Sequence, residues 1–322
     1  MKTTRIAALA AAAVLGLSAI SPAVAQDEEM MKDPGAAADS KLFVNMKGPG
    51  AGNPFWAAVE EGAVQAGIDY GVDLTVLAPP TESDVTAQIA QVEDAVVQGA
   101  AGIAIAPTDP EALGPALDEA LAQGVNVVFV DSNGTNEGVS FIGTDNQAGA
   151  ALAGEYLCSN LEEGAKVALL QGIISTTTGQ LRAEGGAQAL RDCGLDLVAE
   201  LPADWDVQRG QAVTEDILTQ HPDLAGIFAS NDNMALGAIE ALRLQDLIDQ
   251  VTVVGFDANP NAADSILAGE MSATVAQNPF NMGYFGVESL IALINGETLD
   301  PVIDTGTVLV DESNAAEFAS GE

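Results

Sequence analysis

Basic residues are scarce in this sequence. Lys and Arg together number 10 against 47 Asp and Glu, which gives a formal net charge of −37 at pH 7. This small number of cations cannot neutralise a phosphate backbone. We therefore expect no nucleic-acid partner and no electrostatic attachment to an anionic membrane surface. The acidity indicates a solvated acidic surface more than a cationic ligand, because net charge reports mainly on solubility.

Histidine and metal-ligand clusters are also lacking. The one histidine, His221, stands before Pro222 and has the pattern of a helix end. The sequence contains no serine–histidine arrangement and no cluster of ligand residues at metal-binding spacing. We therefore expect no metal, no cofactor and no nucleophilic triad.

Cysteine occurs twice, at Cys158 and Cys193. Both lie near the ends of predicted helices that flank a predicted strand at residues 166–172, so the two side chains could meet. An even count in an exported chain favours one disulfide, and two buried thiols are the alternative.

Long apolar runs are absent after the N-terminus. Residues 6–20 form the one long run, behind Lys2 and Arg5, and Ala23-Val24-Ala25 follows it with the small residues of a signal-peptidase site. This pattern predicts a signal peptide over residues 1–25, and the run is short for a membrane anchor. We expect a mature protein in the periplasm without stable membrane insertion, beginning with an acidic, disordered leader over residues 26–40.

The rest of the chain alternates short apolar runs with helical patterns. Strands that are apolar on both faces belong to parallel sheets covered by helices. About 280 residues exceed one small core, and nine or ten strands fall into two series that divide near residues 133–145. The sequence therefore predicts an α/β fold of two Rossmann-like, doubly wound lobes. The strands are expected at 42–46, 74–78, 103–106, 127–130, 167–170, 197–201, 227–229, 251–256 and 273–276.

Amides, carboxylates and aromatic residues follow these strands. In doubly wound sheets, ligands bind beyond the carboxyl ends of the strands. Amides and carboxylates bond hydroxyl groups, and aromatic faces cover the apolar face of a sugar or polyol. An ordinary role is open for several of them, since acids and amides there also cap helices. The residues in question are Asn53, Phe55, Trp56, Asp131, Gln180, Arg182, Trp205, Asn231, Asp232, Asp257 and Gln277.

The glycine-rich turn at residues 48–52 offers a nucleotide site as an alternative. It resembles the GxGxxG loop, but Asn53 stands where the last glycine belongs, and the second predicted strand ends at Pro79-Pro80 rather than at the acid that binds a ribose. We therefore do not expect a nucleotide ligand.

Taken together, these segments resemble the periplasmic sugar-binding proteins of ABC transporters, in the ribose-binding branch. The resemblance covers residues 42 to about 310. Its motifs are NPFW at 53–56, NVVFVD ending at Asp131, LLQG at 169–172, PADW at 202–205, FASNDNMALGA at 228–238, VVGFD at 253–257 and ATVAQ at 273–277.

The resemblance implies two lobes joined by a three-strand hinge, with the sugar buried between them. It implies a monomer that closes on a sugar or polyol and delivers it to a membrane permease, without catalysis. The lobes are expected at residues 41–144 with 278–304, and at 145–277 with 305–322. The ligand-binding residues implied are Asn53, Phe55, Trp56, Asp131, Ser132, Gln180, Arg182, Trp205, Asn231, Asp257 and Gln277.

Two positions depart from the ribose-binding pattern. Ser132 and Gln180 stand where those relatives have arginines, while Arg182 matches the second arginine of their motif. Loss of two guanidinium groups should change the hydroxyl pattern accepted, so a hexose, another pentose or a linear polyol is open. The alternative function is an exported α/β enzyme that acts on a glycoside with Asp131 and Asp257 as its carboxylate pair.

Overall fold

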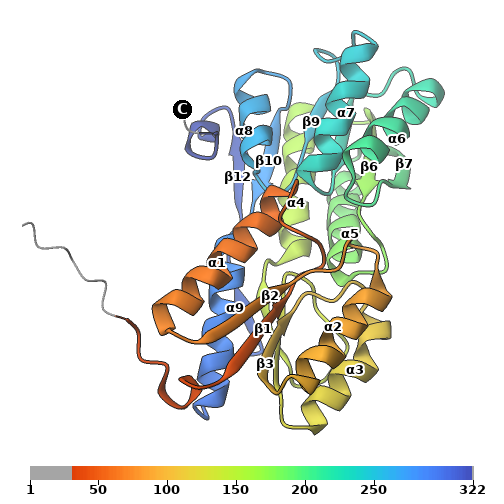
Figure 1. The fold of residues 1–322 in the computed structure, drawn as a ribbon. Helices are drawn as coiled ribbons and strands as arrows, with labels where there is room; N and C mark the ends of the chain where they lie inside the picture. The colour runs from red at the N-terminus through yellow and green to blue at the C-terminus, as the bar shows by residue number, and fades with distance from the viewer. Residues whose placement is uncertain (1–30, 321–322) are drawn as a thin grey trace, which may run out of the picture. The chain divides into compact units, whose positions relative to one another are not determined.

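The computed structural model describes residues 31–320. Within this range the strands form two sheets of six strands each (Figure 1). Neighbouring strands are parallel throughout, except that the last strand runs antiparallel to β10. The two doubly wound α/β sheets predicted from the sequence are confirmed.

The first sheet and its helices are called the N-terminal lobe here. Its strands are β1 (Lys41–Asn45), β2 (Asp73–Leu77), β3 (Ala100–Ile105), β4 (Asn126–Val130), β5 (Ser140–Gly143) and β11 (Val302–Asp304), in the order β11-β5-β4-β3-β1-β2. Its helices are α1 (Pro54–Tyr70), α2 (Val85–Val97), α3 (Pro110–Ala122) and α9 (Pro279–Ile294).

The second sheet and its helices are called the C-terminal lobe. Its strands are β6 (Lys166–Gln171), β7 (Asp196–Pro202), β8 (Gly226–Ala229), β9 (Thr252–Val254), β10 (Ala273–Ala276) and β12 (Val308–Asp311), in the order β12-β10-β9-β8-β6-β7. Its helices are α4 (Asn146–Asn160), α5 (Thr177–Asp192), α6 (Val207–Gln220), α7 (Asp232–Leu244) and α8 (Pro260–Leu267), with a final 3₁₀ turn η2 (Ala315–Glu317).

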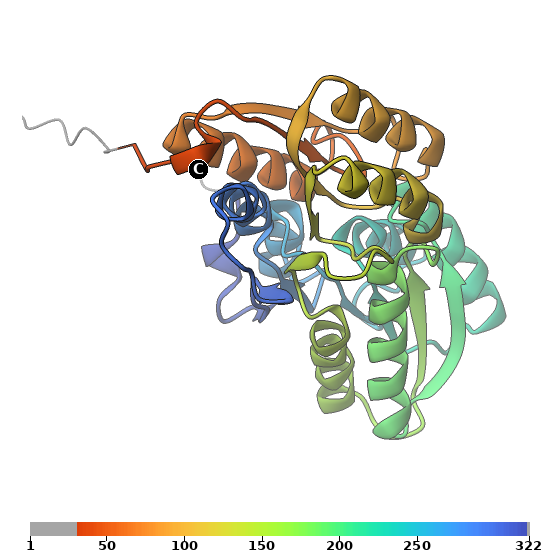
Figure 2. The same ribbon diagram turned by 90° about the horizontal axis from the view of Figure 1, so that it is seen from below.

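Each sheet is covered by helices on both faces, because successive side chains of a strand point to opposite sides. In β1, Leu42 and Val44 pack in the core formed with α1 and α9, whereas Phe43 packs in the core formed with α2 and α3. Seen from below in Figure 2, the helices lie on the outside of the strands in both lobes. In β6, Leu169 faces the α4 and α5 side, and Leu170 faces α6 and α7. This double burial explains why the strands read as continuous apolar runs in the sequence.

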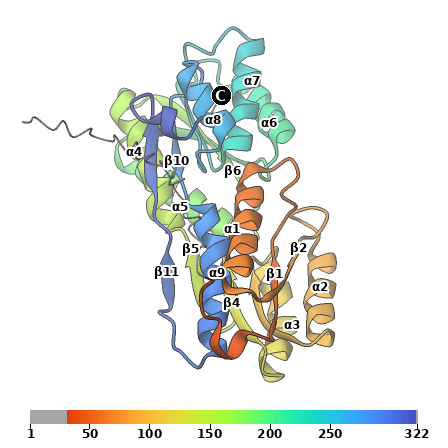
Figure 3. The same ribbon diagram turned by 60° about the vertical axis from the view of Figure 1, so that its left-hand side comes forward.

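The chain passes between the two lobes three times within the described residues: after β5, after β10 and after β11 (Figure 3). Two of these crossings are bonded to each other, since the Thr144 hydroxyl donates to Gln277 Oε1 at 2.8 Å. The third contains Gly306, whose φ of 82° suits glycine.

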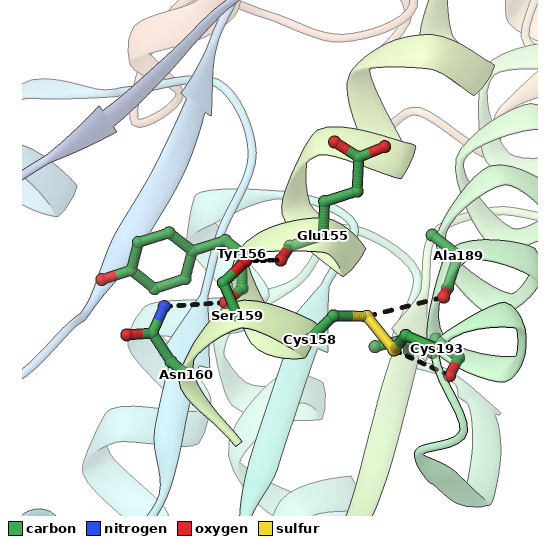
Figure 4. The surroundings of a disulfide bond; sticks show 8 residues. Glu155, Tyr156, Cys158, Ser159, Asn160, Ala189 and Cys193 are labelled. Carbon is green, nitrogen blue, oxygen red and sulfur yellow. Dashed lines mark hydrogen bonds between the residues drawn. A yellow bond between two sulfur atoms is a disulfide. The ribbon is translucent and has the colours of Figure 1, made fainter. Parts of the chain in front are cut away.

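The disulfide predicted from the sequence is confirmed. Cys158, in the last turn of α4, is bonded to Cys193, which caps the C-terminal end of α5; the two Cα atoms lie 6.0 Å apart (Figure 4). The bond therefore joins two neighbouring helices on one face of the second sheet.

The N-terminal expectations meet the structure only in part. The signal peptide predicted at residues 1–25 lies outside the described residues. The leader was expected to be disordered through residue 40, but residues 35–37 form the 3₁₀ turn η1 (Gly35–Ala37). The composition of this segment gave no sign of its partner: Ala36 N donates to Oδ1 of Asn295, which caps the C-terminal end of α9, at 2.7 Å.

Among residues 31–320, the structure has no helix that combines the length and the apolarity needed to cross a bilayer.

Candidate functional site

A narrow cavity lies where the carboxyl ends of strands from both sheets meet. Its volume is about 310 Å³ when the part open to solvent is included. Both lobes contribute to its wall. The lining residues are Lys47, Asn53, Phe55, Trp56, Glu82, Asp131, Thr178, Arg182, Trp205, Asn231, Asp257 and Gln277.

The start of α1 places an amide and two aromatic rings at the cavity. Asn53 caps the helix by accepting a hydrogen bond from Phe55 N at 3.2 Å, and the rings of Phe55 and Trp56 meet edge to face at 4.9 Å. The indole is fixed by Glu82, whose Oε1 accepts from Trp56 Nε1 at 2.8 Å and from Asn53 Nδ2 at 3.3 Å. Burial raises the pKa of Glu82, and the charge of Lys47 opposes this rise.

A buried ion pair joins the ends of β1 and β4. Lys47 Nζ lies 2.7 Å from Asp131 Oδ2, and both side chains are less than 5 % exposed. The same ammonium lies 5.7 Å from the centre of the Trp56 ring, within reach of a cation–π contact. Asp131 has φ of 60°, a conformation that costs energy for a residue other than glycine and is found at functional sites.

Arg182 of α5 is held on all sides in the C-terminal lobe. Its Nε donates to Asn146 Oδ1 and its Nη1 to the carbonyl of Ser230, each at 2.8 Å, and Nη1 lies 3.3 Å from Asp257 Oδ1. The guanidinium carbon lies 3.8 Å from the centre of the Phe256 ring. These contacts leave little freedom to this buried cation, which makes it a preorganised part of the wall.

Asp257 is a buried acid whose protonation responds strongly to these surroundings. Burial raises its pKa to about 7, while the charge of Arg182 opposes the rise. Gln277 Nε2 donates to its Oδ1 at 2.5 Å. Behind it, Asp232 accepts from the Thr274 hydroxyl at 2.6 Å and from Asn259 N at 2.7 Å, and burial raises the pKa of Asp232 well above its usual range.

The second tryptophan, Trp205, closes the cavity from the C-terminal lobe. Its φ is 64°, and its indole lies against Gly172, where a Cβ would come within 2.0 Å of the ring. A glycine is therefore needed in the LLQG motif for this close approach. Trp205 Nε1 is buried and has no hydrogen-bond partner among residues 31–320. Asn231 Nδ2 donates to the Trp205 carbonyl at 3.4 Å.

The structure brings together all the residues expected to bind ligand except Ser132 and Gln180. Ser132 Oγ lies 3.2 Å from Thr177 Oγ1 of the other lobe, and Gln180 Nε2 donates to the Ile174 carbonyl at 2.9 Å.

Some of these residues cap helices, as considered above, and others do not. Asn53 and Asn231 cap α1 and α7, in addition to lining the cavity. Asp131 and Asp257 cap no helix among residues 31–320, since the N-cap positions of α4 and α8 are Asp145 and Asn259.

Lys47, Glu82 and Thr178 line the cavity but were not foreseen. Lys47 directly follows the run that forms β1, so the rule that ligands meet strand ends could have found it. Glu82 lies in the loop after β2, past the two prolines, where no strand end marks it. Thr178 lies in the first turn of α5, and its hydroxyl donates to the Asp131 carbonyl at 3.0 Å across the lobes.

Several known proteins are similar to this chain. The ribose import binding protein of Escherichia coli is 38% identical over 246 residues, which are 76% of this chain and 82% of that protein. The D-ribose/D-allose-binding protein of Pseudomonas aeruginosa is 34% identical over 271 residues, covering 80% and 85% of the two chains. The Caulobacter myo-inositol binding protein, solved with myo-inositol, is 31% identical with a TM-score of 0.80, covering 87% of this chain and 95% of that one.

These relatives are binding proteins, and none is named as an enzyme. The comparisons therefore favour a solute-binding role over an exported enzyme that uses Asp131 and Asp257 as a carboxylate pair. The periplasmic binding protein domain matches residues 46–298, more than three quarters of the sequence. By this match, and by the shared two-lobed fold, the chain belongs to the periplasmic binding protein family.

Proposed function

We propose that this protein captures a neutral sugar or cyclitol in the periplasm and delivers it to the permease of an ABC importer. The observation that carries the proposal is the wall of the cavity, in which Trp56 and Trp205 from different lobes stand among acids and amides. An indole covers the apolar face of a ring, and the acids and amides bond its hydroxyl groups. The relatives' names support this ligand class, since they include ribose, allose and myo-inositol.

The proposed ligand contacts come from both lobes. Trp205 Nε1, which is buried without a hydrogen-bond partner in the described part of the chain, would donate to a ligand oxygen. The remaining contacts are assigned to the lining side chains at the strand ends and helix starts, namely Asn53, Phe55, Trp56, Asp131, Arg182, Asn231, Asp257 and Gln277, together with Lys47 and Glu82. A six-membered ring suits two indoles better than a linear polyol does, because a flat ring presents a continuous apolar face.

Capture is proposed to occur by hinge closure between residues 41–144 with 278–304 and residues 145–277 with 305–322. The crossings after β5, β10 and β11 would act as the hinge, since few residues connect the lobes there. A monomer suffices for this mechanism, because one chain supplies both walls.

A titration tests the ligand class. We expect one of D-allose, D-ribose, D-arabinose, D-glucose or myo-inositol to change tryptophan fluorescence and to raise the melting temperature. At a concentration 100 times the dissociation constant, binding stabilises the protein by about 2.7 kcal/mol. The Asp257→Asn variant, which keeps the size of the side chain, should bind the same ligand about 5- to 150-fold more weakly, as expected for a lost partner worth 1–3 kcal/mol. A panel that moves neither signal would reject a sugar or cyclitol ligand.

Export and delivery are tested separately. Mass spectrometry of protein from the periplasmic fraction should find an N-terminus at Gln26. Uptake of the labelled ligand by cells should require the protein, and a cytoplasmic location or uptake that does not depend on it would contradict the proposed transport role.

A further inference from the structure

A second binding feature lies on the N-terminal lobe, at the end of α1 remote from the ligand cavity. α1 begins with the cavity residues and ends at Tyr70, about 24 Å further along its axis at 1.5 Å per residue. There the side chain of Lys32 reaches between α1 and α9. It meets four residues, which we call the ammonium cage: Asp69, Tyr70, Tyr284 and Glu288.

Two rings and a carboxylate lie against the ammonium group of Lys32, whose side chain is 47 % exposed. Lys32 Nζ lies 5.1 Å from the centre of the Tyr70 ring, 4.8 Å from that of Tyr284 and 3.4 Å from Glu288 Oε1. An ammonium within about 6 Å of an aromatic ring centre is attracted by the negative face of the ring. Two such rings and an acid are the recognition chemistry of a cation.

The cage is held together by its own hydrogen bonds. The Tyr70 hydroxyl donates to Glu288 Oε1 at 2.5 Å, and the Tyr284 hydroxyl donates to Asp69 Oδ2 at 2.7 Å. Gln65 Nε2 donates to the other oxygen of Asp69 at 2.6 Å. Rings and acids therefore fix one another across the two helices without Lys32, so the cage does not depend on the lysine for its shape.

The backbone around Lys32 is docked as well. Lys32 N donates to the Asp69 carbonyl at 2.7 Å, and Asn295 bonds both Ala36 N and the Pro34 carbonyl, at 2.7 and 3.2 Å. Glu288 and Asn295 are seven residues apart and share one face of α9. Residues 32–38 thus follow α9 for two turns before β1 begins (Figure 1, Figure 3).

Composition makes this arrangement unusual for the chain. It has only three tyrosines and 10 basic residues, yet two tyrosines and one lysine meet here. The Tyr284 hydroxyl and Glu288 raise the pKa of Lys32, and the Tyr284 hydroxyl lowers the pKa of Asp69. Both shifts favour a charged lysine beside a charged acid.

We propose that Asp69, Tyr70, Tyr284 and Glu288 form a binding site for a primary ammonium group, which the chain fills with its own Lys32. Residues 32–38 are then a strap that joins the C-terminal end of α1 to α9. Both helices begin beside the ligand cavity. Asn53 caps the start of α1, and α9 begins two residues after Gln277. The strap stabilises this helix pair at the opposite end.

Charge-matched variants test the site. Lys32→Gln should lower the melting temperature by about 2–4 °C. Lys32→Arg, which keeps the cation, should retain the wild-type value. Lys41→Gln is the matched control, because within the described residues Lys41 Nζ bonds only the Gln98 carbonyl, at 3.3 Å, and has no aromatic partner there. In the folded wild type, Lys32 should be acetylated more slowly than Lys41.

Chemical rescue separates an ammonium site from a merely structural strap. In Lys32→Ala, n-propylammonium chloride should restore part of the lost melting temperature, compared with sodium chloride at equal ionic strength. It should have no such effect on Lys41→Ala. Equal behaviour of the two glutamine variants with equal acetylation rates would overturn the proposal. So would a loss in Lys32→Gln that neither arginine nor propylammonium recovers.

Discussion

Lys47 and Asp131 form an ion pair of 2.7 Å inside the ligand cavity, although both side chains are almost fully buried. The pair joins β1 to β4, the strand ends that lie on either side of β3 in the first sheet. Buried charges are tolerated in proteins when they are paired, and the loss of one partner leaves an uncompensated charge.

The variant Lys47→Met should therefore destabilise the ligand-free protein. Breaking a buried pair costs about 3–5 kcal/mol in free energy of unfolding, and denaturant unfolding measures it. The double variant Lys47→Met/Asp131→Asn removes both charges and should recover much of the loss. A single variant within about 0.5 kcal/mol of wild type, the range of ordinary surface substitutions, would show that the pair is not buried in solution.

Thr177 should stabilise the closed arrangement of the lobes. Its hydroxyl accepts from Asn133 N at 2.8 Å and donates to the Asn133 carbonyl at 3.1 Å, so α5 is bonded directly to the loop after β4. Thr177→Val removes these bonds and keeps the shape of the side chain. At about 0.5–1.5 kcal/mol for each of the two bonds, the closed state should lose about 1–3 kcal/mol. Ligand affinity should then fall by about 5- to 150-fold.

Calorimetric titration and small-angle X-ray scattering measure this effect. At a ligand concentration that half-saturates wild type, the scattering should report a larger radius of gyration for Thr177→Val, whereas Thr177→Ser, which keeps the hydroxyl, should behave as wild type. Unchanged affinity and radius in Thr177→Val would mean that the contact contributes nothing to closure.

The raised pKa of Asp257 predicts a loss of stability as the pH rises. In the unfolded chain this carboxyl ionises near its usual 3.8, but in the folded protein burial raises the pKa to about 7. Between these values the folded state binds more protons, so the free energy of unfolding decreases from about pH 4 to about pH 7 and then levels. Asp232, whose pKa is also raised, acts in the same direction.

Urea unfolding of the ligand-free protein between pH 4.5 and 8 checks this dependence. Asp257→Asn cannot ionise there and should lose less stability over the range than wild type. Acids with lowered pKa values, such as Asp69 and Asp311, act in the opposite direction but below about pH 4. Parallel curves for the two proteins would show that Asp257 is already ionised at the start of the range.

The fold and much of the cavity wall could be predicted from the sequence because both follow local rules. Buried parallel strands read as short apolar runs, and the residue after each run lies at the edge where ligands bind. Asp131 and Asp257 were found in this way. Glu82 escaped because it lies in a loop past Pro79 and Pro80, and only the packing of α1 against that loop brings it to Trp56.

Several side-chain contacts between distant segments could not be predicted. Ser132 was expected to face the ligand, yet it bonds Thr177, since the closure of one lobe on the other decides where the side chain lies. The turn at residues 35–37 of the leader was missed for the same reason. The composition of the leader is typical of disorder. Its partners Glu288 and Asn295, however, lie more than 200 positions further along the chain, and such contacts leave no local pattern in the sequence.

Removal of the disulfide should lower stability without changing ligand affinity. The bond joins cysteines 35 residues apart, and a loop of this size contributes about 3–4 kcal/mol by restricting the unfolded chain. The double variant Cys158→Ser/Cys193→Ser should lose this amount in guanidinium unfolding, because its unfolded state is less constrained. Neither cysteine lines the cavity, so titration with the ligand should give the wild-type dissociation constant.

Wild type treated with a reductant is the matched control and should unfold at the same denaturant concentration as the variant. A variant as stable as the oxidised wild type would show that strain at α4 and α5 cancels the entropic gain, and altered affinity would show that the α4–α5 pair participates in closure.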